Sequence, residues 1–180
     1  MRKVLVKDIT NELNEHIQNK IEETIYCIHD QPLVFVSKAN EINYEELEKS
    51  NVIVCPSQNF GGTIVASAGD MDMAIFKLNG WHVGSEFLKN IKEKLDKYIP
   101  NLSIDKNDLI AEGKYKLISY ASVNAGDNLI YTCVHISFNP NVELINKICS
   151  KPMKKIPKSL KDYGLTTNML EQILQEINID

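Results

Sequence analysis

The segment Gln58-Asn-Phe-Gly-Gly-Thr-Ile-Val-Ala-Ser-Ala-Gly-Asp-Met-Asp-Met-Ala-Ile-Phe76 carries the strongest local signals in this 180-residue chain. It contains the only adjacent glycine pair, Gly61-Gly62, and glycine lets a backbone take positive φ or lets another group approach it closely. The β-branched run at residues 63–65 predicts a strand, Gly69-Asp70 predicts a turn, and the alternation at residues 71–75 predicts a second strand. The segment therefore predicts a glycine loop followed by a hairpin. Either the loop brings backbone N–H groups to a ligand, or its glycines only form the turn.

The sequence before this segment contains one long helical pattern and two short apolar runs. Apolar residues at steps of four predict an amphipathic helix over residues 11–26, with Thr10 as its N-cap. The apolar runs predict strands at residues 33–36 and 52–55, with a short helix at residues 44–49 between them.

The sequence after the segment predicts further helices and strands. They are a helix over residues 86–98 capped by Ser85, strands at 109–111 and 116–121 around a turn at Gly113, a core strand at 129–138, and helices at 142–148, 159–163 and 168–177, the last capped by Thr166 or Thr167. Strands and helices do not alternate strictly, so we expect an α+β single domain with a central mixed β-sheet and flanking helices. The expected core includes Leu33, Phe35, Val52, Val54, Val65, Ile75, Leu117, Ile118, Val134, Ile136 and Phe138.

The amino-acid composition indicates a globular domain and argues against some classes of partner. Hydrophobic residues make up 43% of the chain, which is typical of a globular domain and enough for a core without disulfide staples. The net charge of −4 argues against a nucleic-acid-binding protein, which normally carries a basic surface. No apolar run approaches the roughly 20 residues of a membrane span, and the N-terminus lacks the apolar core of a signal peptide. We therefore expect a cytoplasmic protein with neither nucleic-acid nor membrane partners.

The residues that could perform chemistry are scattered and leave alternatives open. The four cysteines lack the spacing of metal ligands and are expected to be buried free thiols. Cys133 and His135 would share one face of a strand, either as an activated nucleophile or as core packing. Asp70 and Asp72 could bind a divalent ion or serve only the turn. Lys116, at the start of an apolar strand, either offers positive charge to a phosphate or only extends to solvent.

The order of these stretches resembles the catalytic domain of the lipoate–protein ligase A family, within the wider superfamily of biotin and lipoate ligases and octanoyltransferases. Residues 31–37 are similar to its Pro-x-Val-Val-Ile-Gly strand, residues 61–69 to its glycine signature, residues 113–121 to its Gly-x-Lys-Ile-Ser-Gly-x-Ala strand, residues 129–139 to its His-Gly-Thr-Leu-Leu-Leu-Asn strand, and Ser159-Leu160 to its late Thr-Ser-Leu. The resemblance covers nearly the whole chain in the family's order.

The chain also departs from the family pattern at positions that handle phosphate and acyl groups. Pro56 and Ser57 stand at the family's arginine pair, Phe60 at its first glycine, Ala66 at its histidine, Cys133-Val134 at its later His-Gly, and Ser119 at the glycine after the lysine. Losing a bidentate guanidinium is not a conservative change at a phosphate site.

The resemblance implies a function and a site. Residues 1–180 are expected to form a single lipoate ligase-like catalytic domain without the family's accessory C-terminal domain, which could be a separate accessory subunit. The implied reaction transfers a lipoyl or octanoyl group through acyl-AMP, with Mg-ATP if the chain makes its own adenylate, to a lysine of a lipoyl-carrier protein domain. The implied catalytic residue is Lys116, and the implied cofactor-binding residues are Gly61, Gly62, Thr63, Lys38 and Ala121. The alternative is a non-catalytic descendant that serves as a binding or scaffold protein.

Overall fold

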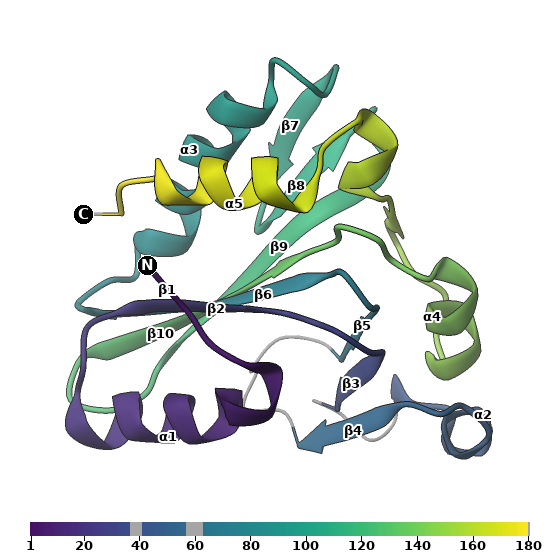
Figure 1. The fold of residues 1–180 in the computed structure, drawn as a ribbon, viewed down its shortest axis with the longest axis horizontal. Coiled ribbons are helices and arrows are strands. Elements are labelled where there is room, and N and C mark those ends of the chain that lie inside the picture. The colour runs from purple at the N-terminus through teal and green to yellow at the C-terminus, as the bar shows by residue number, and fades with distance from the viewer. Residues whose placement is uncertain (37–40, 57–62, 180) are drawn as a thin grey trace.

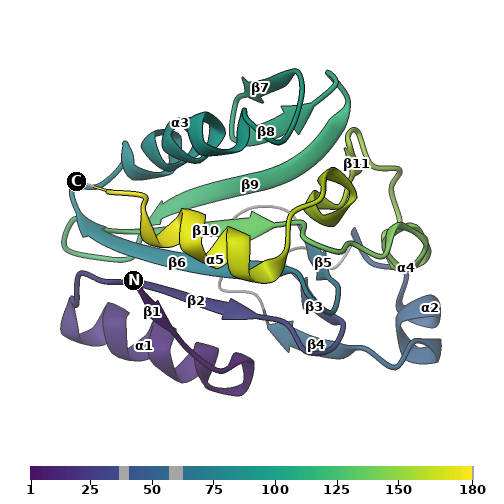
Figure 2. The ribbon, with the colours of Figure 1, turned by 45° about the horizontal axis from the view of Figure 1, so that its top comes forward.

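The computed structural model describes residues 1–36, 41–56 and 63–179 and has an α+β fold with two β-sheets (Figures 1 and 2). The large sheet has the order β1 (Arg2–Lys3), β2 (Thr24–Ile28), β6 (Met71–Leu78), β10 (Leu129–Ile136), β9 (Tyr115–Asn124), β8 (Asp108–Ala111) and β7 (Leu102–Asp105), with β11 (Ile156–Pro157) paired to β9. The small sheet has the order β4 (Ile53–Pro56), β3 (Leu33–Val36) and β5 (Ile64–Ala66). The helices are α1 (Ile9–Asn19), α2 (Tyr44–Lys49), α3 (Val83–Leu95), α4 (Val142–Ile148) and α5 (Thr167–Gln175), with 3-10 turns at Val6–Asp8 and Leu160–Tyr163.

Helices cover both faces of the large sheet. Figure 1 shows α3 and α5 on one face and α1 on the other. Met71, Met73 and Ile75 of β6 pack with α3 and α5 on one face of the sheet. Ala74 and Phe76 pack on the opposite face, which α1 covers. This is the period-2 alternation of a strand, and because β6 lies in the middle of the sheet both faces are buried. Both pairings of β6, with β2 and with β10, are antiparallel, while β1 pairs with β2 in parallel, so the sheet is mixed as expected.

The predicted long helix at residues 11–26 was wrong in its second half. The helix α1 ends at Asn19, because Lys20 adopts a left-handed conformation with φ of 53° and closes the last turn. Ile25 continues the helical spacing, but it lies in β2, where it pairs with Ala74 and is fully buried. Burial of Ile25 in a strand between β1 and β6 therefore overrides the local helical pattern.

The predicted hairpin at residues 63–75 was also wrong in its pairing. The strand β5 pairs with β3 in the small sheet, whereas β6 pairs with β2 and β10 in the large one. The turn between them does form, with the N–H of Asp70 donating to the carbonyl of Ser67 at 3.0 Å. This turn carries the chain from one sheet to the other, so each strand finds its partners elsewhere in the chain.

The structure also differs from the prediction at the starts of two helices and in the burial of residues in or beside the small sheet. The helix α3 begins at Val83 rather than Glu86, and the Ser85 hydroxyl donates to the carbonyl of His82 instead of capping. The cap of α1 is Asp8, not Thr10, whereas Thr166 caps α5 as predicted. Three expected core residues lie in the small sheet or beside it, and they are less buried than predicted: Val54 is 51% exposed, and Phe35 and Val52 are half-buried. Both Ile53 and Val54 of β4 are exposed, whereas Val65 and Ala66 of β5, the other edge strand of this sheet, are buried.

Candidate functional site

A bulge in β9 directs two polar side chains to the same side of the large sheet. Ile118 and Lys116 pair with consecutive residues of β8, so Leu117 between them is an extra residue. Leu117 and Ile118 both pack in the core with α3 and α5. Lys116 and Ser119 both line a cavity, although a spacing of three would place them on different faces of a regular strand.

This cavity, which we call the lysine cavity, has a volume of about 440 Å³ and is bounded by β5, β9, β10 and the segment after α4. Its lining includes Thr63, Lys116, Ser119, His135, Ser137 and Cys149. The ammonium of Lys155 donates to the carboxylates of Asp105 and Asp108 at 2.7 Å each, and all three residues line the cavity. This ion pair ties the segment after α4 to the turn between β7 and β8.

Two of the residues predicted for the site, Thr63 and Lys116, line the lysine cavity together. They belong to distant parts of the chain, so only the fold brings them together. The backbone N–H of Thr63 donates to the Glu41 carboxylate at 3.0 Å, so this N–H already holds an anionic oxygen from the chain itself.

The other predicted residues are not placed in this cavity. Ala121 lies farther along β9, opposite Cys133 of β10, and does not line the cavity. Gly61, Gly62 and Lys38 lie outside the described residues, as do Ser57 and Phe60. Ala66, which replaces the family's histidine, is fully buried in β5.

One residue of the lysine cavity wall, His135, belongs to a buried network of one carboxylate and two imidazoles. Asp72 of β6 lies opposite His135 of β10, and its Oδ1 is 2.8 Å from Nδ1 of His135. Its Oδ2 is 2.7 Å from Nε2 of His29, which follows β2. Because an ionised carboxylate only accepts hydrogen bonds, both imidazoles donate to it. We call these three residues the Asp72 network.

The charged groups of the Asp72 network change one another's pKa. Burial alone would raise the pKa of the Asp72 carboxyl, but the charges and hydrogen bonds of His135 and His29 outweigh burial and hold it well below its usual range. Burial alone would lower the pKa of His135, but Asp72, and with it Asp70, raises it above its usual value. Asp70 has a raised pKa because it is buried, although its oxygens accept from the backbone N–H groups of Ser67 and Asn139 at 2.9 and 2.8 Å.

These contacts concern two pairs of residues whose role the sequence left open, Asp70 with Asp72 and Cys133 with His135. The oxygens of Asp70 and Asp72 accept hydrogen bonds from within the protein, and no cluster of three or more metal-ligating side chains occurs among the described residues. Cys133 packs in the apolar cluster beneath α1, and His135 is bound to Asp72. The side chain that bonds to His135 is thus that of Asp72, and the spacing of Cys133 and His135 in the sequence does not indicate this.

Several residues of the lysine cavity were not predicted for the site. Lys106 and Lys154 line it and add cations beyond Lys116. Cys149 also lines it as a half-buried free thiol, and its pKa is raised chiefly by burial, with a further contribution from Glu41 and an opposing one from Lys116. The basic run around Lys154 was visible in the sequence, but nothing local placed it opposite β9.

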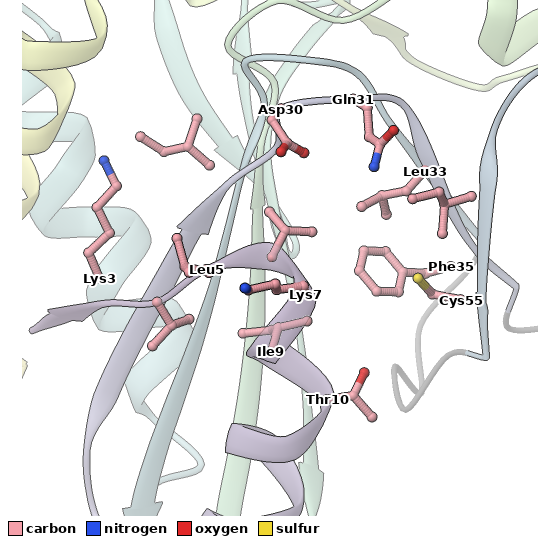
Figure 3. Close-up of a pocket in the computed structure, with 14 residues that line it drawn as sticks. Lys3, Leu5, Lys7, Ile9, Thr10, Asp30, Gln31, Leu33, Phe35 and Cys55 are labelled. Carbon is pink, nitrogen blue, oxygen red and sulfur yellow. The ribbon is translucent and has the colours of Figure 1, made fainter.

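A second cavity, of about 580 Å³, lies between the start of the chain and the small sheet (Figure 3). Leu33, Phe35 and Cys55 form one side of it, and Leu5 and Ile9 lie on the other. We call it the apolar cavity. The rings of Phe35 and His29 are 6.3 Å apart, so the Asp72 network links the walls of the two cavities.

Comparison with solved structures gives matches over almost the whole chain. The LipL1 protein of P. falciparum, solved in complex with lipoate, superimposes with a TM-score of 0.79 at 15% identity, covering 97% of this chain. The bi-partite lipoate protein ligase of Thermoplasma acidophilum, solved with its E2 lipoyl domain, gives 0.78 at 9% identity, covering 97% of this chain and 79% of that one. A lipoate-protein ligase A bound with ATP gives 0.73 at 11%, covering 96% and 79%. The fold is that of the lipoate–protein ligases.

The lipoate–protein ligase fold confirms the resemblance that the sequence indicated. At these identities the likeness establishes the fold alone, and this chain spans 60% of the length of the P. falciparum protein. Neither protein-family models nor curated protein sequences match the chain. Within the described residues, no helix is both long and apolar enough to cross a membrane.

Proposed function

We propose that this protein transfers a lipoyl or octanoyl group from acyl-AMP to a lysine of a lipoyl-carrier domain. The observation that carries the proposal is the meeting of Lys116 and Thr63 in one cavity of a lipoate–protein ligase fold. In this proposal Lys116 is the catalytic residue, and Thr63, with Gly61, Gly62 and Lys38 before it, binds the acyl adenylate.

The chemistry of the lysine cavity suits an acyl phosphate. A lysine ammonium close to the reacting carbonyl stabilises the negative charge that develops there, and it does so more strongly in a cavity with little water. Lys106 and Lys154 add positive charge for a phosphate. The apolar cavity offers a space for an acyl chain, because hydrophobic side chains form most of its wall. Relatives solved with lipoate and with ATP support these ligand classes.

The partner proposed for the chain is a lipoyl-carrier domain, since one relative was solved as a bi-partite ligase with its E2 lipoyl domain. The same relative supports a second polypeptide as an accessory subunit. We place the reaction in the cytoplasm, as expected from the sequence.

A non-catalytic binding protein is the second candidate. Pro56 and Ser57 stand where the resemblance implies two arginines, so the chain lacks a bidentate phosphate contact at these positions. Such a protein would keep the fold and bind an acyl ligand without turnover.

One experiment separates the two candidates. The purified chain is incubated with lipoyl-AMP or octanoyl-AMP and a purified lipoyl domain, and the mass of the domain is followed. The enzyme proposal predicts the mass increase of one acyl group on one lysine, which is absent from a lipoyl domain whose acceptor lysine is replaced by Arg. Saturable binding of the acyl ligand without a mass change would support the binding protein instead.

A further inference from the structure

We propose that Nε2 of His135 accepts the proton that the carrier lysine loses during acyl transfer. This inference rests on the proposed function and adds a second catalytic residue to it. It starts from the place of His135 in β10, opposite Ser119 of β9 and in the wall of the same cavity as Lys116.

Hydrogen bonds fix the orientation of the His135 ring. Nδ1 of His135 donates to Asp72 at 2.8 Å, which fixes the ring and the tautomer. Asp72 is itself fixed, because its other oxygen accepts from His29 at 2.7 Å. Nε2 of His135 is thereby left as the acceptor in the neutral ring, and no hydrogen bond to it occurs among the described residues.

Charged groups of both signs surround the ring of His135. Asp72 of β6 contacts the ring directly, and Asp70, in the turn before β6, has an oxygen 4.0 Å from Nε2. Lys116 of β9 opposes them as a positive charge. His29 is a further titratable group, and it lies on the far side of Asp72 from the His135 ring. The two carboxylates stabilise the imidazolium that forms when Nε2 takes a proton, as a general base requires.

In the proposed transfer step, one C–N bond replaces one C–O bond. The amine nitrogen of the carrier lysine attacks the carbonyl carbon of the acyl adenylate, and a C–N bond forms. The bond between that carbon and the phosphate oxygen breaks, and AMP leaves with the electron pair. The proton lost by the nitrogen moves to Nε2 of His135. The products are the amide, AMP and an imidazolium that later releases its proton to water.

The test measures kcat/KM for transfer from octanoyl-AMP to a purified lipoyl domain between pH 5.5 and 9. The wild type is expected to gain activity as pH rises through one ionisation, whose midpoint should match the His135 pKa measured by NMR. His135→Asn is expected to lose about 100-fold or more and to lose this ionisation. Asp72→Asn should move the ionisation to lower pH, because it removes the charge that favours imidazolium. Added imidazole should raise the rate of His135→Ala in proportion to its neutral form.

Two other histidines serve as controls. His16 is buried and bonded to Glu23, and His82 is 59% exposed at its side chain; neither lines a described cavity. His16→Asn and His82→Asn should keep the wild-type pH profile, even where His16→Asn lowers stability.

Three outcomes would contradict the proposal that His135 is the base. If the wild type transfers the acyl group but His135→Asn keeps its rate and profile, His135 is not the base, although the proposed function stands. If the variants fold poorly, a wild-type kinetic midpoint that differs from the NMR pKa of His135 also overturns the proposal. If the wild type transfers nothing from either acyl-AMP, both this inference and the proposed function fail.

Discussion

The position of Lys116 in the lysine cavity depends on one extra residue in β9. Without the bulge at Leu117, a regular strand would place Lys116 and Ser119 on opposite faces of the sheet. The same alternation explains why Asp72 and His135, which pair directly, share a face. Side chains from separated strands and turns thus meet in the lysine cavity, which no local sequence pattern describes.

At the residue scale, the first prediction concerns Lys116. If the proposed function is correct, Lys116→Ala should lower kcat for transfer from octanoyl-AMP by about 100-fold to 1,000-fold, because one preorganised positive group is lost. Lys116→Arg should not restore full activity, since a guanidinium differs in shape and reach from an ammonium. The matched control is Lys114→Ala, because Lys114 is exposed on the approach to the same strand. Equal rates for the Lys116 and Lys114 variants would contradict the role of Lys116.

A second prediction concerns stability and pH. The pKa of Asp72 is lowered in the folded state, so its stabilisation is present above an unfolded pKa of about 3.9 and is lost as pH falls. The pKa of His135 is raised, so its stabilisation is present below an unfolded pKa of about 6.5 and is lost as pH rises through the folded value. Asp72→Asn should therefore cost most, roughly 1.5–3 kcal/mol, between about pH 4 and 6.5.

Urea denaturation of the wild type and Asp72→Asn at pH 5.5 and pH 8.5 measures this difference. The gap between the two proteins should be narrower at pH 8.5 than at pH 5.5, because the stabilisation that comes from the raised pKa of His135 is lost as pH rises. A gap that stays constant or widens at pH 8.5 would show that His135 and Asp72 are not coupled as described.

At the element scale, the packing of α3 depends on one glycine. Gly84 lies in the first turn of α3, and a Cβ at this position would overlap the ring of Tyr120 in β9. The close approach lets Phe87 and Leu88, farther along the same helix, reach the core and become fully buried. The helix could not move away without exposing these side chains.

Gly84→Ala is therefore expected to destabilise the protein by about 1–3 kcal/mol, although alanine is the better helix former. Tyr120→Leu in the same chain should recover part of this loss, because the smaller side chain removes the overlap. Glu93→Ala, on the exposed side of α3, is the control and should change little. Thermal unfolding of the wild type and these three variants measures the effect, and a Gly84→Ala protein as stable as Glu93→Ala would contradict this packing.

At the scale of the whole molecule, the fold is that of the lipoate–protein ligases, and the prediction concerns the cations of the lysine cavity. The cations placed in the lysine cavity are Lys106, Lys116, Lys154 and Lys155, and Lys155 is already paired with two aspartates. Lysines supply point charges without the bidentate grip of arginine. We expect the chain alone to bind Mg-ATP weakly, with a Kd of roughly 1 mM or more.

Isothermal titration with Mg-ATP, and separately with lipoate and octanoate, tests this expectation. Lys154→Ala should weaken the residual ATP binding, whereas Lys151→Ala, a lysine of the same segment that does not line the cavity, should not. Micromolar ATP affinity, together with transfer to a carrier domain, would show that the lysines replace the missing arginines.

The sequence by itself determined the class of fold and many of its elements. The alternation at Met71, Met73 and Ile75 places β6 correctly, and the helical spacing in α3 identifies its buried face. The predicted cap of α5 was Thr166 or Thr167, and the structure has Thr166. These features depend on neighbours within a few residues, which is the range over which caps and periodic patterns act.

Only the tertiary structure decided the pairing and the site. An apolar strand pattern shows which side chains are buried but does not name the partner strand, so β5 and β6 were assigned to one hairpin although they belong to two sheets. The helical spacing that ends at Ile25 could not reveal a place beside Ala74. The Asp72 network joins three strands or turns that are far apart in the chain, and hydrogen bonds across such separations leave no periodic signal. The sequence could therefore propose Lys116, while the role inferred for His135 required the fold.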